Sequence, residues 1–402
     1  MKQNNINLLY LSYDGLTDSL GQSQVLPYLI GLQKKGYDIS IISFEKEVNY
    51  LQNEEHIRML CDDNNLSWHP LFYTKKPPVL STLKDVIYLK KVAKKLNKEK
   101  NFSIIHARSY IAALVALKFK KRYGIKFLFD MRGFWADERV EGGIWNLQNP
   151  IYKTIYKFFK RKEKSFFEQS DHIISLTRNG KNEILKQFSA ISEDKITVIP
   201  CCVDTNLFDP STIRPHQFEK LKSALKIKPT DKIIGYVGSI GTWYMLEEML
   251  LFFKKQYDSN KNFKFLFVTK DDFDEIKSVA RKIDLDLNSI IFANTSYRFV
   301  PLHINIMDWG IFFIRPTFSK KASSPTKQGE IMAMGVPVIC NSGVGDTDFI
   351  VKKYQAGVVV ENFDQQINLE KPSNPEAIRK GAIEYFGLEN GVESYGRVYK
   401  KI

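Results

Sequence analysis

Residues 314–339 read IRPTFSKKASSPTKQGEIMAMGVPVI, and this stretch is the most informative in the chain. An apolar strand end runs into a loop of Lys, Ser and Pro residues, and SSPTK then begins a helix with Pro325 near its first turn. The N–H groups at a helix start and the helix dipole attract anions, and Lys327 adds a positive charge. We therefore predict a phosphate or diphosphate site there. The residues expected to form it are Ser323, Ser324, Pro325, Thr326 and Lys327.

Glu330 lies about one helical turn beyond Lys327 in this predicted helix. Its carboxylate suits hydrogen bonding to the two vicinal hydroxyls of a ribose. The alternative is a purely local role, because Ser/Thr-x-x-Glu is common at helix starts, where the glutamate completes a capping box. The spacing to the preceding Ser and Thr residues leaves both interpretations open.

Outward from this stretch, strand-length apolar segments alternate with helical segments along the chain. Strands are expected at 5–13, 37–44, 68–71, 103–107, 126–130 and 172–176, at the start of a strand-and-linker segment 195–209, and at 233–237, 263–268, 289–292, 309–314 and 336–340. Helices are expected at 23–32 (capped by Ser23), 53–64, 84–100, 112–122, 151–167, 180–188, from 246, and at 273–283, 327–334, 375–386 and 390–401. Such alternation indicates parallel βαβ units, and its interruption at 195–209 indicates two doubly wound α/β domains.

Ligands of open α/β sheets bind outside the carboxyl ends of the strands, so the loops after strands come next. In the loop 14–22, Gly15 and Gly21 expose N–H groups, and Gly21 directly precedes the predicted helix, which favours an anion there. The pattern is not GxGxxG, so a dinucleotide fingerprint is absent. The alternative is that these glycines serve only the turn.

The loop 235–245, GYVGSIGTWYM, also follows a predicted strand. Gly238, Ser239 and Gly241 would let a ligand approach the backbone closely. Trp243 and Tyr244 offer rings that could stack on a base or a sugar. The alternative is a tight turn followed by two aromatic core residues.

The composition is that of a globular protein: of 402 residues, 44% are hydrophobic and 26% charged. Four cysteines are too few for a disulfide scaffold and show no CxxC spacing, so we expect reduced thiols in a cytosolic protein. The N-terminus lacks the pattern of a signal peptide, and no apolar stretch reaches the roughly 20 residues that a spanning helix needs. Secretion and integral membrane insertion are therefore not expected.

The net charge of +14 is unevenly distributed. Residues 1–200 carry 32 Lys and Arg against 21 Asp and Glu, whereas residues 201–402 carry 27 against 24. Much of the excess lies in the predicted helices 84–100 and 151–167, where basic residues alternate with apolar and aromatic ones. Such helices bind anionic lipid surfaces, and the alternative is a core-facing helix with a solvated lysine face. No nucleic-acid-binding motif is present, so nucleic acid is not an expected partner.

Over nearly its whole length the chain resembles a retaining family-4 glycosyltransferase of the GT-B fold, of the type that assembles bacterial polysaccharides and glycans. The segment LLYLSYDGLTDSLGQSQVLPYLIGLQKKGYDISIIS resembles that family's first strand, glycine loop, helix and second strand. IIHARS and FLFDMRGFWADE resemble later strand ends of its first domain, and KITVIPCCVDTNLFDP resembles its interdomain segment. SPTKQGEIMAMGVPVI resembles its donor-site helix, and EAIRKGAIEYFGLENGVESYGRVYKKI its terminal helices.

This resemblance implies an α/β GT-B architecture of two Rossmann-like, doubly wound domains facing across a cleft. Residues 1–200, with the returning helix 388–402, would bind the acceptor, and residues 201–387 would bind a nucleoside-diphosphate sugar. The residues implied on the donor side are Gly21, Gly238, Ser239, Gly241, Trp243, Tyr244, Arg315, Ser323, Ser324, Pro325, Thr326, Lys327 and Glu330. On the acceptor side, Asp130 and Arg132 are expected to contact the acceptor or organise the cleft.

Two alternatives accompany the acceptor-side residues. His106 ends a strand and is expected to reach the cleft as a third catalytic group, yet a lone histidine is as often structural. Arg132 could instead form a salt bridge with Asp137, which would be worth little.

The implied reaction needs stabilisation of the leaving group above all. In a GT-B enzyme helix dipoles and cationic side chains supply it, so neither a metal nor another cofactor is implied. The resemblance also implies front-face attack, in which the departing phosphate takes the acceptor proton and the configuration is retained.

The sequence departs from the family pattern at two places. The family often has two glutamates eight positions apart: Glu330 matches the second, but Ala322 stands where the first would be. Backbone groups or hydroxyls of residues 323–326 are the expected replacement. The family also commonly has an Arg and a Lys after the first strand of the second domain, whereas this chain has SIGTWYM, so Lys327 and Arg315 become the substitute candidates.

The resemblance, together with the two basic helices, thus implies a hexosyltransferase-type enzyme that adds a sugar to a glycan acceptor, lipid-linked at the inner face of the cell membrane. It would be cytoplasmic and peripherally bound to an anionic membrane surface. The alternatives are a nucleotide-sugar epimerase or inverting GT-B relative, and a non-catalytic nucleotide-sugar-binding or membrane-adaptor subunit.

Overall fold

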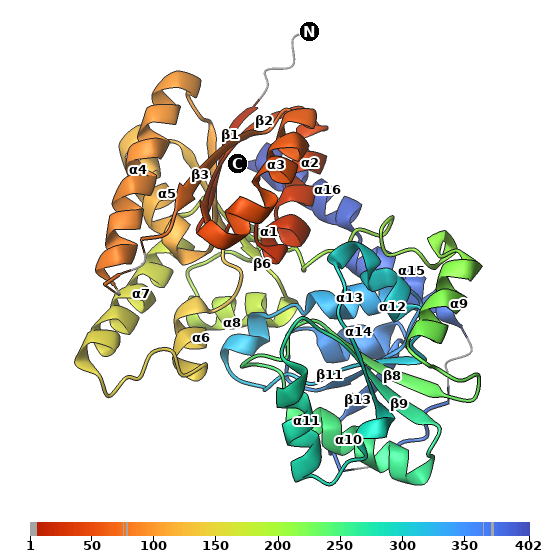
Figure 1. Ribbon diagram of the computed structural model, residues 1–402. Helices are drawn as coiled ribbons and strands as arrows, with labels where there is room; N and C mark the ends of the chain where they lie inside the picture. Colours follow the sequence, from red (N-terminus) through yellow and green to blue (C-terminus); the bar gives the residue numbers. More distant parts are fainter. Residues whose placement is uncertain (1–5, 75, 78, 365, 371–373) are drawn as a thin grey trace. The chain divides into compact units, whose positions relative to one another are not determined.

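The computed structural model describes residues 6–74, 76–77, 79–364, 366–370 and 374–402. The chain forms two compact units, one of residues 1–200 with 388–402 and the other of residues 201–387 (Figure 1). Each unit is built on one parallel sheet, which confirms the predicted pair of doubly wound α/β domains. Asn5, the first residue of the predicted strand 5–13, lies outside the described residues.

The first unit contains a seven-stranded sheet in the order β3-β2-β1-β4-β5-β6-β7. Its strands are β1 (Ile6–Ser12), β2 (Tyr37–Glu45), β3 (Ser67–Phe72), β4 (Ile104–Arg108), β5 (Lys126–Asp130), β6 (His172–Ser175) and β7 (Ile196–Val198). Every residue of β4 is buried, as expected for a central parallel strand with helices on both faces. The strand order changes direction between β1 and β4, where Ser12 and Arg108 are paired at the carboxyl ends.

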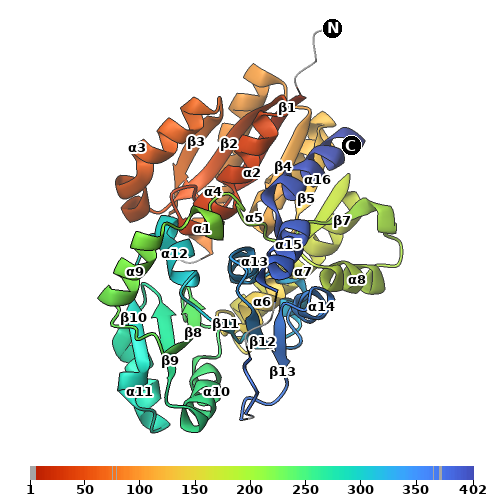
Figure 2. The ribbon, with the colours of Figure 1, turned by 90° about the vertical axis from the view of Figure 1, so that its right-hand side faces the viewer.

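The helices of this unit are α1 (Ser19–Gln24), α2 (Leu26–Gln33), α3 (Glu47–Asp63), α4 (Leu80–Lys100), α5 (Ser109–Tyr123), α6 (Trp135–Glu141), α7 (Pro150–Gln169), α8 (Arg178–Gln187) and α16 (Leu388–Lys401). The terminal helix α16 packs beside α2 (Figure 2). A Cβ at Gly31 would lie 2.6 Å from a methyl of Val392, so glycine allows the close approach. The predicted return of the C-terminal helix to the first domain is thereby confirmed.

The second unit contains a six-stranded sheet in the order β10-β9-β8-β11-β12-β13. Its strands are β8 (Lys232–Val237), β9 (Phe263–Val268), β10 (Ile290–Ala293), β11 (Trp309–Phe312), β12 (Val338–Asn341) and β13 (Gly357–Val360). Its helices are α9 (Pro215–Ala224), α10 (Leu246–Ser259), α11 (Phe273–Lys282), α12 (Val300–Ile304), α13 (Thr326–Ala333), α14 (Thr347–Lys353) and α15 (Pro375–Phe386). The strand order changes direction between β8 and β11, which is where ligands of such sheets bind.

The predicted elements differ from the structure mainly at their ends. The prediction of one helix at 23–32 capped by Ser23 is wrong, because α1 begins at Ser19 and the helical conformation is interrupted at Val25 before α2 begins. Pro27, in the first turn of α2, has no N–H for a continuous helix, and its ring would clash with the preceding turn. The helices α6, α9, α12 and α14 and the strand β13 were not predicted, because their apolar patterns are short.

All four cysteines are free and buried, which agrees with the prediction that they form no disulfide. Within the described part of the chain, no helix combines the length and the apolar character needed to cross a membrane.

Candidate functional site

The start of α13 holds the two charged residues singled out from the sequence. Lys327 and Glu330 lie one turn apart on this helix, and both side chains are buried, at 5% and 7% exposure. The burial follows from tight packing of the helix, since a Cβ at Gly310 of β11 would lie 2.7 Å from Ile331. A Cβ at Gly329 would lie 3.0 Å from Phe386 of α15. These two glycines therefore allow α13 to pack closely between the sheet and α15.

The ammonium of Lys327 lies between two aromatic rings. Nζ is 3.9 Å from the ring centre of Tyr236 at the end of β8 and 3.6 Å from that of Tyr244 in the following loop. Among the described residues, Nζ has no hydrogen-bond partner. Burial lowers the pKa of Lys327 well below its ordinary value, although the charges of Glu330 and Asp271 oppose this.

Gly238 lies directly beside this ammonium. Its φ of +102° belongs to the left-handed region that side chains rarely adopt, and a Cβ there would lie 3.5 Å from Nζ of Lys327. The glycine therefore leaves the space beside Lys327 Nζ free of a side chain, and its role in ligand binding stays a prediction.

Glu330 is held by a residue that sequence reasoning missed. The hydroxyl of Tyr297, in the turn after β10, donates to Oε1 of Glu330 at 2.8 Å. Burial raises the pKa of Glu330, while the Tyr297 hydrogen bond and the Lys327 charge lower it. The capping-box alternative finds no support, because in the described chain the start of α13 has no side-chain cap hydrogen bond. An aromatic residue after a strand was the one available signal for Tyr297.

The loop after β8 is tied down by hydrogen bonds to its own unit. The hydroxyl of Tyr236 donates to the carbonyl of Ser239, and the N–H of Ile240 donates to Oδ2 of Asp271 at 2.5 Å. The N–H of Gly241 donates to Oγ of Ser239 at 3.2 Å. Tyr236 and Asp271 were not predicted as site residues, and they hold the loop in place.

The neighbouring residues Trp243 and Tyr244 contact different side chains. Tyr244 and Ile314 form an antiparallel bridge, and the N–H of Arg315 donates to the carbonyl of Trp243 at 3.0 Å. The indole of Trp243 is contacted by Lys320 Nζ, at 3.7 Å from its centre, and by the Arg315 guanidinium at 5.1 Å. The structure thus places Tyr244 at Lys327 and Trp243 with Arg315, so these predicted residues form two neighbouring clusters.

The residues before α13 are also engaged. Oγ of Ser324 accepts from the N–H of Cys201 at 3.1 Å, and the N–H of Ser323 donates to the carbonyl of Lys320 at 3.1 Å. Ala322, where the first family glutamate would stand, is fully buried. Pro325 precedes the first helical residue, Thr326, as predicted.

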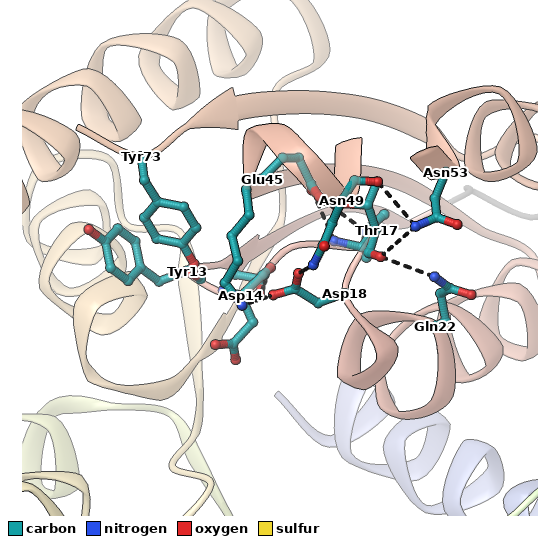
Figure 3. A network of polar contacts seen from close by, with 12 residues as sticks. Tyr13, Asp14, Thr17, Asp18, Gln22, Glu45, Asn49, Asn53 and Tyr73 are labelled. Carbon is teal, nitrogen blue, oxygen red and sulfur yellow. Dashed lines mark hydrogen bonds and ion pairs between the residues drawn. The ribbon is translucent and has the colours of Figure 1, made fainter. Parts of the chain in front are cut away.

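In the first unit, the loop 14–22 is fixed by the buried carboxylate of Glu45 (Figure 3). Glu45 accepts from the N–H groups of Leu16 and Thr17, at 2.9 and 3.0 Å. A Cβ at Gly15 would lie 2.5 Å from this carboxylate. Gly15 is therefore explained by packing inside the unit.

The expectation that Gly21 directly precedes a helix is wrong. Gly21 lies within α1, because this helix already begins at Ser19, and a Cβ there would lie 2.1 Å from the carbonyl oxygen of Gly15. The backbone of the same loop occupies that space. The glycine is thus required by the fold, and its role in donor binding stays a prediction.

His106 lies in a buried network with the returning helix. Its Nδ1 is 2.6 Å from the hydroxyl of Tyr399, and its Nε2 is 3.3 Å from Oδ2 of Asp130, which also accepts from Tyr395 at 3.1 Å. His106 is 2% and Asp130 1% exposed. Burial lowers the pKa of His106. Burial also opposes the charge of Asp130, but Arg132 and His106 outweigh it and hold the pKa of Asp130 below its ordinary value. This geometry supports the structural alternative for His106.

Arg132 follows β5 in a strained conformation. Its φ of +59° is in the left-handed region, which costs about 1 kcal/mol or more for a residue with a side chain. Its Nη1 lies 3.8 Å from Oδ1 of Asp130. Asp137, the alternative partner, instead contacts Lys160 at 2.8 Å and the hydroxyl of Tyr156 at 2.8 Å.

Arg108 was not predicted as a site residue, although it stands at the end of β4 beside Ser12. Its guanidinium is buried, and Nε lies 3.4 Å from Oδ2 of Asp14. The signal in the sequence was its position two residues after His106 at a strand end. Across the described residues, no group of three or more His, Cys, Asp or Glu side chains could hold a metal ion.

Two family models match successive parts of the chain. Residues 24–207 match Glycosyltransferase Family 4, and residues 217–371 match Glycosyl transferases group 1. None of the curated proteins compared with the chain matches it.

Solved structures share the fold at low sequence identity. A glycosyltransferase from Rickettsia africae is 19% identical with a TM-score of 0.70, over 99% of this chain and 98% of that one. Anabaena HepE in complex with UDP and glucose is 12% identical with a TM-score of 0.70, over 99% and 100%. The lipopolysaccharide outer core galactosyltransferase WaaB is 12% identical with a TM-score of 0.64, over 99% and 100%.

Proposed function

This chain is a glycosyltransferase of the GT-B fold, and on that premise we propose that it is a retaining hexosyltransferase that moves a sugar from a nucleoside-diphosphate sugar to a lipid-linked glycan. The observation that carries the proposal is the pair Lys327 and Glu330 at the start of α13, buried without an ion pair between them. Burying a cation and a carboxylate is costly unless a ligand uses them. The fold neighbour HepE binds UDP and glucose, which supports a nucleotide sugar as the ligand.

Each residue then has a chemical role. Lys327 and the N–H groups at the start of α13 would face the diphosphate, whose developing charge is the main electrostatic demand of glycosyl transfer. Glu330, oriented by the hydroxyl of Tyr297, would accept from the two ribose hydroxyls. Lys327 would thereby replace the Arg and Lys that the family carries after the first strand of its second domain. Arg315 adds a further positive charge.

The acceptor would bind to the first unit, at the carboxyl ends of its strands. Asp130 ends β5, and the strained Arg132 follows it. The change of strand order is flanked by Arg108 and Asp14. No enzymic nucleophile is needed if the departing phosphate takes the acceptor proton as the new bond forms. His106 would support this site indirectly, through Asp130 and α16.

The surface of α4 supports a membrane-bound acceptor. This helix buries Val86, Leu89, Ala93 and Leu96 against its unit, yet its exposed face also begins with Leu80, Leu83, Ile87 and Tyr88, which are 50–61% exposed. Lysines continue the same face toward the C-terminus of the helix. A core-facing helix with a solvated lysine face does not need these exposed apolar residues. An apolar and cationic face of this kind fits the interface of an anionic bilayer, where the chain would bind peripherally on the cytoplasmic side.

The proposal is tested first by donor binding. Thermal unfolding is measured with UDP-, GDP- and CMP-sugars, for the wild type, Glu330→Ala and the exposed control Glu219→Ala. At a concentration about 100 times Kd, the true donor should stabilise the wild type and the control by roughly 2.7 kcal/mol, and Glu330→Ala much less. If no nucleotide sugar stabilises the folded protein, the transferase proposal is overturned.

Turnover then separates the alternatives. The proposed enzyme forms a glycosylated product from the donor only when an acceptor such as a prenyl-diphosphate-linked sugar is present, and the anomeric configuration is kept. An epimerase would convert the nucleotide sugar without an acceptor, and an adaptor would bind the donor without turnover.

A further inference from the structure

We propose that Lys327 takes up a proton from solvent when the nucleoside-diphosphate sugar binds and releases it when the nucleoside diphosphate leaves, so that binding itself creates the positive charge of the site. This inference rests on the proposed function and adds a proton to its binding step.

The geometry around Lys327 leaves its ammonium without a counterion. The side chain is 5% exposed, and in the described part of the chain Nζ meets neither a hydrogen-bond acceptor nor a carboxylate within ion-pair distance. Its close neighbours are the rings of Tyr236 and Tyr244, at 3.9 and 3.6 Å. Ring faces stabilise a cation far less than water does.

The charged and titratable groups that face Lys327 come from β8, the loop after β8, α13 and the loop after β9. Tyr236 and Tyr244 belong to β8 and its loop, Glu330 to α13, and Asp271 follows β9. Asp271 already accepts from the N–H of Ile240, and Glu330 already accepts from Tyr297 of the turn after β10. Neither carboxylate is thus dedicated to Lys327.

These surroundings shift both buried groups toward their neutral forms. Burial lowers the pKa of Lys327 well below its ordinary value and raises the pKa of Glu330. Burial also raises the pKa of Tyr244 to about 12, so this hydroxyl stays protonated and supplies no negative charge. The free site therefore holds less charge than its residue types suggest.

A diphosphate reverses this balance. Gly238 places no side chain beside Nζ, so that side of the amine is open to phosphate oxygens. Two negative charges beside the amine favour its protonated form. The amine then binds one proton from solvent, forming –NH₃⁺, which has three N–H donors and no acceptor. When the nucleoside diphosphate leaves, the proton returns to solvent.

The linkage has a defined sign. Where the free amine is unprotonated and the bound one protonated, one proton enters with each donor molecule, and donor affinity falls as pH rises, by about tenfold per pH unit. Below the pKa of the free amine, the proton is already present and affinity becomes independent of pH. The diphosphate of a nucleotide sugar is esterified at both ends and does not titrate near neutral pH.

The test is calorimetric titration of the full chain. The probe is whichever of UDP-glucose, UDP-galactose, UDP-N-acetylglucosamine and GDP-mannose binds most tightly. The binding heat is measured at one pH in phosphate, HEPES and Tris buffers, whose ionisation enthalpies differ, so that its slope against ionisation enthalpy gives the number of protons taken up. The titration is repeated between about pH 6 and pH 8.5 to follow donor affinity and proton uptake against pH.

Three variants make the result specific to Lys327. Lys327→Met removes the amine in a side chain of similar shape, and Lys327→Arg keeps a charge at every pH. Lys320→Met removes a neighbouring lysine on the Trp243 ring. We expect uptake approaching one proton in the wild type and in Lys320→Met, and none in the two Lys327 variants, whose donor affinity should not change with pH.

The outcomes separate the two proposals. Donor binding without proton uptake by the wild type, or uptake that persists in Lys327→Met, overturns the proton linkage and leaves the transferase proposal standing. If none of the four nucleotide sugars binds, the donor site itself is wrong, and both proposals fall.

Discussion

His106 Nδ1 lies 2.6 Å from the hydroxyl of Tyr399, a residue 293 positions further along the chain. The contact joins the middle of β4, rather than the strand end expected from the sequence, to the terminal helix α16 within the first unit. Tyr395, one turn earlier on α16, donates to Asp130 beside the same histidine. A buried polar network of this kind holds the terminal helix in one position, because each member would be left unsatisfied if α16 shifted.

Removing either partner should therefore reduce stability. We expect Tyr399→Phe to lower the free energy of unfolding by about 1–2 kcal/mol. We expect His106→Phe to lower it by about 2–4 kcal/mol, because this variant leaves both Tyr399 and Asp130 without their hydrogen-bond partner. Urea titration followed by circular dichroism measures both, with Tyr88→Phe on the exposed face of α4 as the control. Full stability of His106→Phe with lost turnover would instead assign His106 to catalysis.

Acid should destabilise the first unit through its buried histidines. Burial, the largest cause, lowers the pKa of His172 to about 4, and Lys401 adds to the effect. In the unfolded chain His172 binds a proton at about pH 6.5, so the unfolded chain holds more protons than the folded chain between pH 6.5 and 4. Stability should fall as pH drops through this window. The variant His172→Asn should show a smaller loss of melting temperature between those pH values, and an unchanged loss would contradict the assignment.

Gly238 should be intolerant of a side chain. Alanine at this position is strained by the φ of +102° and puts a methyl beside Nζ of Lys327. We expect Gly238→Ala to weaken donor binding about tenfold or more and to cost about 1 kcal/mol of stability.

Gly124→Ala is the matched control for Gly238→Ala. Gly124 has a φ of +70° with nothing within 4 Å of its Cβ position, and it lies at the end of α5. It should lose similar stability while its donor affinity, measured by calorimetry, stays unchanged. Equal losses of affinity in the two variants would remove Gly238 from the site.

Tyr297 should act through Glu330. Tyr297→Phe removes the hydroxyl that donates to Oε1 at 2.8 Å, which leaves the carboxylate less well oriented toward a ribose. We expect the donor KM to rise about five- to tenfold with a small change in kcat, from steady-state kinetics. Tyr123→Phe, an exposed position, serves as the control. A deoxyribose analogue of the donor should bind the wild type and the variant equally. If the variant binds this analogue more weakly than the wild type does, Tyr297 does not act through the ribose contact of Glu330.

The exposed apolar face of α4 should mediate membrane binding. Leu83→Glu together with Ile87→Glu should reduce co-sedimentation with phosphatidylglycerol vesicles about tenfold, because both side chains are more than half exposed and neither supports the core. Phosphatidylcholine vesicles should bind the wild type weakly. Ile383→Glu, an exposed position on α15, should bind as the wild type does. Equal binding by all three proteins would contradict the membrane proposal.

The order of strands and helices was largely predictable. The strands 126–130 and 263–268 and the helix 375–386 agree with β5, β9 and α15 to the residue, because apolar periodicity and Pro or Gly punctuation are local signals. The break between α1 and α2 was missed although Pro27 marks it. Lys327 and Glu330 were found because they share one helix start.

What the sequence determined by itself is thus the two doubly wound sheets and the helix that carries Lys327 and Glu330, which follow from residues close together in the chain. Only the tertiary structure decided that Tyr236 and Tyr244 surround Lys327, that Tyr297 orients Glu330, and that His106 faces α16. The physical reason is that burial and partner choice are set by where distant segments meet. A lysine or histidine has the same local pattern whether it faces water, a ring or a carboxylate, and its chemistry depends on which it meets.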